Sequence, residues 1–213
     1  MDLVPLVFTS GWASGINAYA VVLLLGLMGR VGWADATPDA LQRTDVLIVA
    51  TVLFLIELVA DKIPYVDSVW DALHTVIRPV AGATVAALIA GQDGSLGEIA
   101  AGTVGGVTAL VSHLIKASAR MAVNSSPEPA SNMVVSAAED VTVAGVIVLA
   151  IVYPTAAAVV AAVLLVAGGL VLFFLASRIR RFWGILRERR AQRALARTAA
   201  PAPTPGGAGP SGR

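Results

Sequence analysis

Long apolar stretches separated by short polar segments dominate the pattern along this chain. The stretches lie at about residues 4–30, 45–60, 66–90, 96–122, 130–152 and 155–177. About 20 residues of helix cross a bilayer, so this pattern predicts an all-α membrane protein. The stretch at 45–60 is short and the one at 66–90 is apolar only in its latter half. We therefore predict about six transmembrane or partly re-entrant helices.

Composition supports a membrane protein over a soluble one. Of the 213 residues, 57% are hydrophobic and only 14% are charged. Soluble domains carry about 25% charged residues, so roughly half the usual charge indicates a chain whose surface faces lipid. The chain has no cysteine, which excludes disulfides, thiol catalysis and cysteine-ligated metals.

The composition divides the chain into three parts. Residues 1–177 are the predicted polytopic membrane domain. Residues 178–198 are rich in arginine with interspersed apolar residues, which predicts a basic amphipathic helix that lies on the membrane and attracts anionic lipid. Residues 199–213 are mostly Pro, Gly, Ala and Ser and are predicted to be disordered. We expect no nucleic-acid partner, because attachment to a membrane already explains the basic charge.

The basic residues also predict an orientation. Nine of the fifteen lie at or beyond Arg178, and cytoplasmic segments of membrane proteins are enriched in Lys and Arg. Six spans would place both termini on one side. The prediction is a bacterial inner-membrane protein with its N- and C-termini in the cytoplasm.

One polar segment interrupts the apolar pattern between residues 57 and 82. Four of its side chains follow at i, i+4, i+7 and i+11, which is one face of a helix. The preceding helix carries two carboxylates at i, i+4. These six residues are Glu57, Asp61, Asp67, Asp71, His74 and Arg78. Pro79 follows Arg78 directly and predicts a kink.

Two further groups complete the candidate residues. His113, Lys116 and Arg120 form a basic stripe at i, i+3 and i+7, which can form ion pairs with the acidic side chains of residues 57–71. A second polar segment at 124–140 contains Asn132, Glu139 and Asp140. Ser131 or Asn132 is a candidate helix cap, and one of the two adjacent carboxylates is expected to pair with Lys116 or Arg120.

A charge within the bilayer costs roughly 2.5–3.5 kcal/mol on insertion scales, so a cluster of this kind needs a reason. Carboxylates beside an imidazole suit a proton relay or a hard divalent cation, with Asp67 and Asp71 as the candidate metal ligands. No other cofactor is predicted. The alternative is that these charges lie in headgroup water and satisfy one another.

Several motifs resemble one bacterial membrane-protein family. They are GWASGINAY near the start, E-x-x-x-DKIP-x-x-D-x-x-x-D followed by IRP, H-x-x-K-x-x-x-R, and SPEP-x-SN with a later ED. The chain resembles the family called domain of unknown function 4126 over about Val7 to Ile151. The resemblance implies a small multi-pass inner-membrane protein and carries no activity with it.

The residues leave three functions open. The first is a small transporter or channel, coupled to protons or cations, with a pathway lined by the acidic and histidine side chains. The second is a metal-dependent enzyme acting on a lipid phosphate, with Lys116 and Arg120 as the phosphate clamp. The third is a non-catalytic scaffold. We favour transport over an enzyme, and a homo-oligomer is compatible with each.

Overall fold

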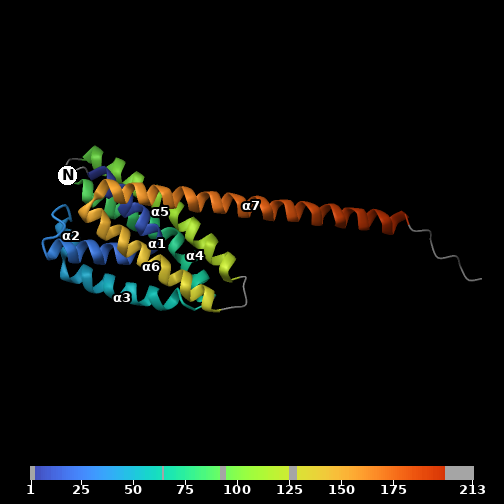
Figure 1. Ribbon diagram of the computed structural model, residues 1–213, viewed down its shortest axis with the longest axis horizontal. Coiled ribbons are helices and arrows are strands. Elements are labelled where there is room, and N and C mark those ends of the chain that lie inside the picture. Colours follow the sequence, from blue (N-terminus) through green and yellow to red (C-terminus); the bar gives the residue numbers. More distant parts are fainter. Residues whose placement is uncertain (1–2, 64, 92–94, 125–128, 200–213) are drawn as a thin grey trace, which may run out of the picture. The chain divides into compact units, whose positions relative to one another are not determined.

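The computed structural model describes residues 3–63, 65–91, 95–124 and 129–199, and these residues form helices and short connections without a strand (Figure 1). The helices are α1 (Leu3–Arg30), α2 (Asp39–Gln42), α3 (Thr44–Ala60), α4 (Val66–Ala90), α5 (Ser95–Asn124), α6 (Pro129–Val152) and α7 (Pro154–Ala199). The predicted all-α class is confirmed.

The outer surface of the helices is apolar, as a lipid environment requires. Five helical stretches of the described chain are long and apolar enough to cross a bilayer, namely Leu3–Arg30, Val66–Ala90, Gly97–Asn124, Ala130–Val152 and Pro154–Arg178. α3 has 17 residues and is about 26 Å long, slightly short of a typical hydrocarbon core of about 30 Å. Its exposed face carries Val52, Leu55 and Val59, whereas Glu57 is fully buried. Apolar side chains therefore face outward and charges face inward, which makes this a membrane protein.

α1 does not continue as one straight helix. Asn17 has non-helical backbone angles (φ −150°, ψ 93°) and separates an N-terminal arm from a C-terminal arm. Leu3 and Leu6 of the first arm line the same pocket as Leu25 of the second. In a straight helix Leu3 and Leu25 would be about 33 Å apart, so the two arms fold back on each other. In Figure 1 the N-terminus and α2 accordingly lie at the same end of the helical bundle.

This folded-back α1 corrects the prediction that residues 4–30 form one crossing. Both arms return to the end of the bundle where α6 finishes and α7 begins, because Ala150, Ile151 and Pro154 line the pocket that also holds Leu3 and Leu25. α1 is thus a re-entrant helical hairpin. It packs against α3, α4, α5 and α6 and lies at their centre.

Glycines allow α1, α4 and α5 to approach closely. A Cβ atom on Gly15 would lie 1.9 Å from Ser112 Oγ and 2.1 Å from the Ala109 carbonyl oxygen. A Cβ on Gly105 would lie 2.3 Å from the Ala86 Cβ and 2.6 Å from the Gly82 oxygen. Neither position has room for a larger residue. The backbones of these three helices are therefore in direct contact, as small residues at membrane helix crossings permit.

Contacts group the chain into one unit from Met1 to Leu172 and a second from Phe173 to Arg213. The predicted break between the apolar stretches 130–152 and 155–177 is present, because α6 ends at Val152 and α7 begins at Pro154. The backbone of the basic segment 178–198 is a continuation of α7 and does not begin a new helix. α4 likewise continues as a helix through Pro79. The tail 200–213, predicted to be disordered, lies outside the described residues.

Candidate functional site

A buried network of charged side chains lies where the tip of α1 meets α3, α4, α5 and α6. Its carboxylates are Glu57 of α3, Asp61 directly after α3, Asp67 and Asp71 of α4 and Glu139 of α6. Its cations are Arg78 of α4 and Lys116 and Arg120 of α5. Asp67 and Arg78 are eleven residues apart on α4, so the network extends about 16 Å along the helix axis. It therefore reaches from one end of the bundle to about half the thickness of a bilayer.

Arg78 forms the inner end of the network and is completely buried. Its Nη2 donates to Glu57 Oε1 at 2.7 Å and its Nη1 donates to Asp71 Oδ1 at 3.1 Å. Nη1 also lies 2.7 Å from His113 Nδ1, which must accept because a guanidinium only donates. Asp71 and Arg78, which the sequence places on one helix face, thus form an ion pair. It is a buried pair and not one exposed to headgroup water.

Lys116 links the inner and outer parts of the network. Its Nζ donates to Asp61 Oδ2 at 2.7 Å and lies 3.7 Å from Glu57 Oε1 and 3.8 Å from Glu139 Oε2. Burial alone would raise the pKa of the Asp61 carboxyl, but the charge of Lys116 lowers it below its usual value. Asp61 is therefore held as a carboxylate by the cation beside it.

Arg120 uses every N–H of its guanidinium. Nε and Nη2 donate to Glu139 Oε2 at 3.1 and 2.7 Å, and Nη2 also reaches Asp61 Oδ2 at 3.3 Å. Nη1 donates to the Asp61 carbonyl and to Asn132 Oδ1, both at 2.7 Å. Asn132 lies in the first turn of α6, so the prediction that it caps this helix is wrong. It joins α6 to Arg120 and Asp61 instead.

The hydrogen-bond partners of the two histidines fix where each imidazole carries its proton. His74 Nδ1 lies 2.7 Å from the Trp70 carbonyl, so this nitrogen donates and Nε2 accepts from the Tyr19 hydroxyl at 3.0 Å. His113 accepts from Arg78 at Nδ1, which leaves Nε2 to donate to the Thr75 hydroxyl at 3.1 Å. Each imidazole therefore has one proton in this arrangement, and its tautomer is fixed by its partners.

The broken backbone of α1 supplies the final partners of the network. Asn17 acts as the N-cap of the second arm, since its Oδ1 accepts from the Ala20 N–H at 2.9 Å. The turn at Asn17 removes the helical donors that the Gly15 and Ile16 carbonyls would otherwise have. The Ile16 carbonyl accepts instead from Lys116 Nζ at 2.9 Å, and the Gly15 carbonyl from Arg78 Nη1 at 3.4 Å. Buried cations thus stabilise the non-helical tip.

Asp67 and Asp71 do not form a metal site with a third ligand. Both Asp67 carboxylate oxygens accept from Asn124 Nδ2, at 2.9 and 2.8 Å, and Asp71 pairs with Arg78. No group of three His, Asp or Glu side chains is placed to hold a metal ion anywhere in the described ranges.

All twelve predicted site residues lie in or beside this network. Asp140 is at its edge, 3.7 Å from Lys62 Nζ and 3.3 Å from Asn17 Nδ2. The sequence also contains partners that were not among the predicted site residues. Asn124 continues the stripe of Lys116 and Arg120 at i+4 from Arg120, so helical spacing could have identified it. Tyr19 carried no such signal, because its contact with His74 depends on the turn in α1.

Comparison with known proteins identifies the family. The model of the family described as Domain of unknown function (DUF4126) matches residues 4–173. This range covers the whole of the network and the folded-back α1. No curated protein and no solved structure matches the chain.

Proposed function

Because this chain belongs to the DUF4126 family, whose description assigns no activity, we propose a function from the geometry alone: a small proton- or cation-coupled transporter or channel of the bacterial inner membrane. The observation that carries this proposal is an excess of carboxylates over cations in the network. Four buried carboxylates and the partly buried Glu139 face three buried cations, Arg78, Lys116 and Arg120.

An excess of negative charge is costly in a site from which water is largely excluded. Charges that leave water without a compensating partner lose several kcal/mol each, by order of magnitude. Three of the carboxylate oxygens, Glu57 Oε2, Asp61 Oδ1 and Asp71 Oδ2, are buried and have no hydrogen-bond partner among the described residues. A proton or a monovalent cation at these oxygens would reduce both costs. The site is therefore suited to take up and release positive charge.

The re-entrant α1 supports a pathway through the bundle. Non-helical backbone at membrane depth occurs where it is buried in protein or lines a cavity, and broken helices often form transport sites. Here the tip at Gly15 and Ile16 closes the inner end of the network. The tip is held by Arg78 and Lys116, so a change in the charge around these two cations would weaken its attachment. This provides a physical link between cation uptake and movement of a gate.

The basic end of the chain orients this arrangement. The end of the bundle with Asp61 and Asn124 is the end towards which α7 runs from Pro154, since Gly168 contacts Ile115 of α5. The arginine-rich continuation of α7 favours a cytoplasmic location for that end. The network then opens to the cytoplasm. Because α1 folds back, we expect the N-terminus on the side opposite the C-terminus, whereas six spans would put both termini on one side.

The enzyme alternative has less support from the geometry. A phosphate clamp needs free donors, but all five N–H groups of Arg120 are already used and Lys116 is beside carboxylates. The scaffold alternative leaves the buried charge excess without a role. The attraction of the basic segment to anionic lipid and any homo-oligomer remain predictions that transport does not depend on.

Proteoliposomes with an internal pH-sensitive dye test the proposal. A potassium gradient with valinomycin makes the interior negative, and the wild-type protein is expected to acidify it faster than empty liposomes. Asp71→Asn retains an acceptor for Arg78 but removes a carboxylate, so it should reduce the rate at least tenfold. Asp45→Asn changes an exposed carboxylate outside the network and should leave the rate unchanged.

The dye experiment is repeated with a sodium gradient and a sodium-sensitive dye to cover other cations. Size-exclusion chromatography confirms that each variant is monodisperse before reconstitution. Wild-type rates equal to those of Asp71→Asn for both protons and sodium would refute the proposal.

A further inference from the structure

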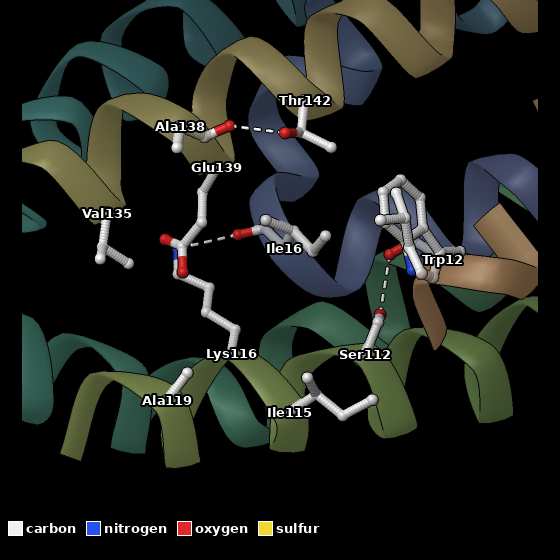
Figure 2. Close-up of a pocket in the computed structure, with 11 residues that line it drawn as sticks. Trp12, Ile16, Ser112, Ile115, Lys116, Ala119, Val135, Ala138, Glu139 and Thr142 are labelled. Carbon is white, nitrogen blue, oxygen red and sulfur yellow. Dashed lines mark hydrogen bonds and ion pairs between the residues drawn. The ribbon is translucent and has the colours of Figure 1, made fainter. Parts of the chain in front are cut away.

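A pocket of about 280 Å³ lies beside the network, between α1, α5 and α6, and Leu164 of α7 forms part of its wall. Figure 2 shows Lys116 and Glu139 extending toward each other from α5 and α6, with the Trp12 ring on the α1 side. We infer that this pocket binds a small amphiphilic organic cation, with an apolar body and one positive group. In so far as that cation is the cargo, the inference rests on the proposed function.

The free hydrogen-bonding capacity in the pocket is that of an acceptor. Glu139 binds Arg120 and Lys116 through Oε2, and within the described part of the chain its Oε1 has no hydrogen-bond partner. The Glu139 side chain is 17% exposed and lines the pocket. Ser112 and Thr142 donate their hydroxyl protons to the carbonyls of Trp12 and Ala138. They too are left as acceptors.

The cations near the pocket are not available to an anion. Arg120 has no unused N–H, and Lys116 Nζ donates two of its three N–H groups to Asp61 and to the Ile16 carbonyl. The carboxylates of Glu57 and Glu139 lie 3.7 and 3.8 Å from the same Nζ and compete for the third. An anionic ligand would have to displace a buried carboxylate from one of them. The surrounding excess of negative charge opposes an anion and favours a cation. The negative charge around the pocket therefore favours a cationic ligand over an anionic one.

The rest of the wall is suited to an apolar body. Ile16, Ile115, Val135 and Leu164 line it, and the indole of Trp12 offers an aromatic face on which a cation is stabilised. The volume is close to the lower end of the range for small-molecule pockets, which limits the ligand to one ring and a small charged group. Ala138 on the rim is exposed on the outer surface, where lipid would lie, so such a molecule could enter from the bilayer.

The probe we propose is benzyltrimethylammonium, whose charge does not change with pH. Its neutral isostere, neopentylbenzene, and the anion phenylacetate serve as comparisons. Binding is followed in nanodiscs by the fluorescence of Trp12, after the substitutions Trp33→Phe, Trp70→Phe and Trp183→Phe remove the other indoles. The cation is expected to give a saturable response, with at least tenfold weaker responses from the isostere and from phenylacetate.

Two variants test the site from different directions. Glu139→Gln removes the acceptor charge and should weaken cation binding at least tenfold, whereas Glu98→Gln, a carboxylate that does not line this pocket, should not. Ala138→Phe fills the pocket without changing a charge and should abolish binding. This second variant remains informative if the loss of the Glu139–Arg120 pair unfolds the protein.

Three results would overturn the inference: no saturable response to the cation, equal affinity for the cation and its isostere or phenylacetate, or unchanged binding in both pocket variants. Because binding is measured without an ion gradient, the two proposals fail separately. Saturable binding without any ion flux would refute transport and leave the site. Ion flux without binding would refute the site alone.

Discussion

The substitution Arg78→Met tests whether the buried network holds the bundle together. Methionine retains an unbranched apolar side chain like the stem of arginine but lacks the charged guanidinium. The substitution would remove the cation closest to Glu57 and Asp71. Both carboxylates are buried, and Glu57 is only 2.7 Å from the guanidinium that is lost. Removal of one partner of a buried ion pair typically costs about 3–5 kcal/mol. His113 and the Gly15 carbonyl would lose a donor as well, so the upper part of this range is expected.

The assay is the free energy of unfolding, from SDS titration of the protein in mixed micelles. The matched control is Arg43→Met, which removes an exposed arginine that pairs with Asp45 at the same distance, 2.7 Å. This control should leave the unfolding midpoint within experimental error. The double variant Glu57→Gln/Arg78→Met removes a carboxylate together with its cation and should recover part of the loss. A cost for Arg78→Met no larger than that for Arg43→Met would refute the assignment of a buried, mutually dependent network.

Two further predictions concern the packing and the surface. Gly15→Ala places a methyl group 1.9 Å from Ser112 Oγ and should destabilise the protein by about 1–3 kcal/mol. The control Gly145→Ala meets nothing within 4 Å and should stabilise its helix by about 0.5–1 kcal/mol. Thermal unfolding in detergent compares the two variants, and an equal shift in their unfolding temperatures would contradict the close contact of α1 and α5. The hydrogen bond from Arg43 lowers the pKa of the Asp45 carboxyl from 3.8 to about 2, so the stability this pair contributes is present above about pH 4 and is lost as the pH falls toward 2. In Arg43→Met the pKa of the Asp45 carboxyl should return toward 3.8. The pKa is measured by NMR from the ¹³C chemical shift of this carboxyl, whose signal is assigned by its loss in Asp45→Asn. An unchanged pKa would contradict the pairing of Asp45 with Arg43.

Helical spacing was sufficient to predict much of the network. Asp67, Asp71, His74 and Arg78 lie on one face of α4 because side chains at these intervals project from the same side of any helix. The same reasoning placed Lys116 and Arg120 together on α5. The stripes on α4 and α5 meet because a charge within a bilayer needs a partner of opposite charge, and each stripe has few such partners other than the opposite stripe. Local periodicity and the cost of burial therefore determined which residues meet.

The turn in α1 could not be predicted in this way. Residues 4–30 are mostly apolar and contain no proline beyond Pro5, so their local pattern favours one continuous helix. Asn17 adopts extended angles because partners distant in sequence stabilise the alternative: Asp140 accepts from its side chain, and Lys116 and Arg78 bind the carbonyls that the turn exposes. These interactions come from α4, α5 and α6. A sequence pattern that extends over one helix does not contain them.

The same dependence links the charge state of the network to the position of the tip. Lys116 Nζ binds the Ile16 carbonyl and Asp61 Oδ2 at once, and Arg78 binds the Gly15 carbonyl together with Glu57 and Asp71. A proton or cation that neutralises one of these carboxylates weakens its hold on the lysine or arginine, which is then free to change its contact with the tip. Coupling of this kind is reciprocal, because any movement of the tip that releases Lys116 or Arg78 must change the affinity of the carboxylates for positive charge by the same factor. Under the proposed function, a change in the break of α1 at Asn17 would therefore alter the affinity of the network for positive charge, and a change in its carboxylates would alter the position of the tip.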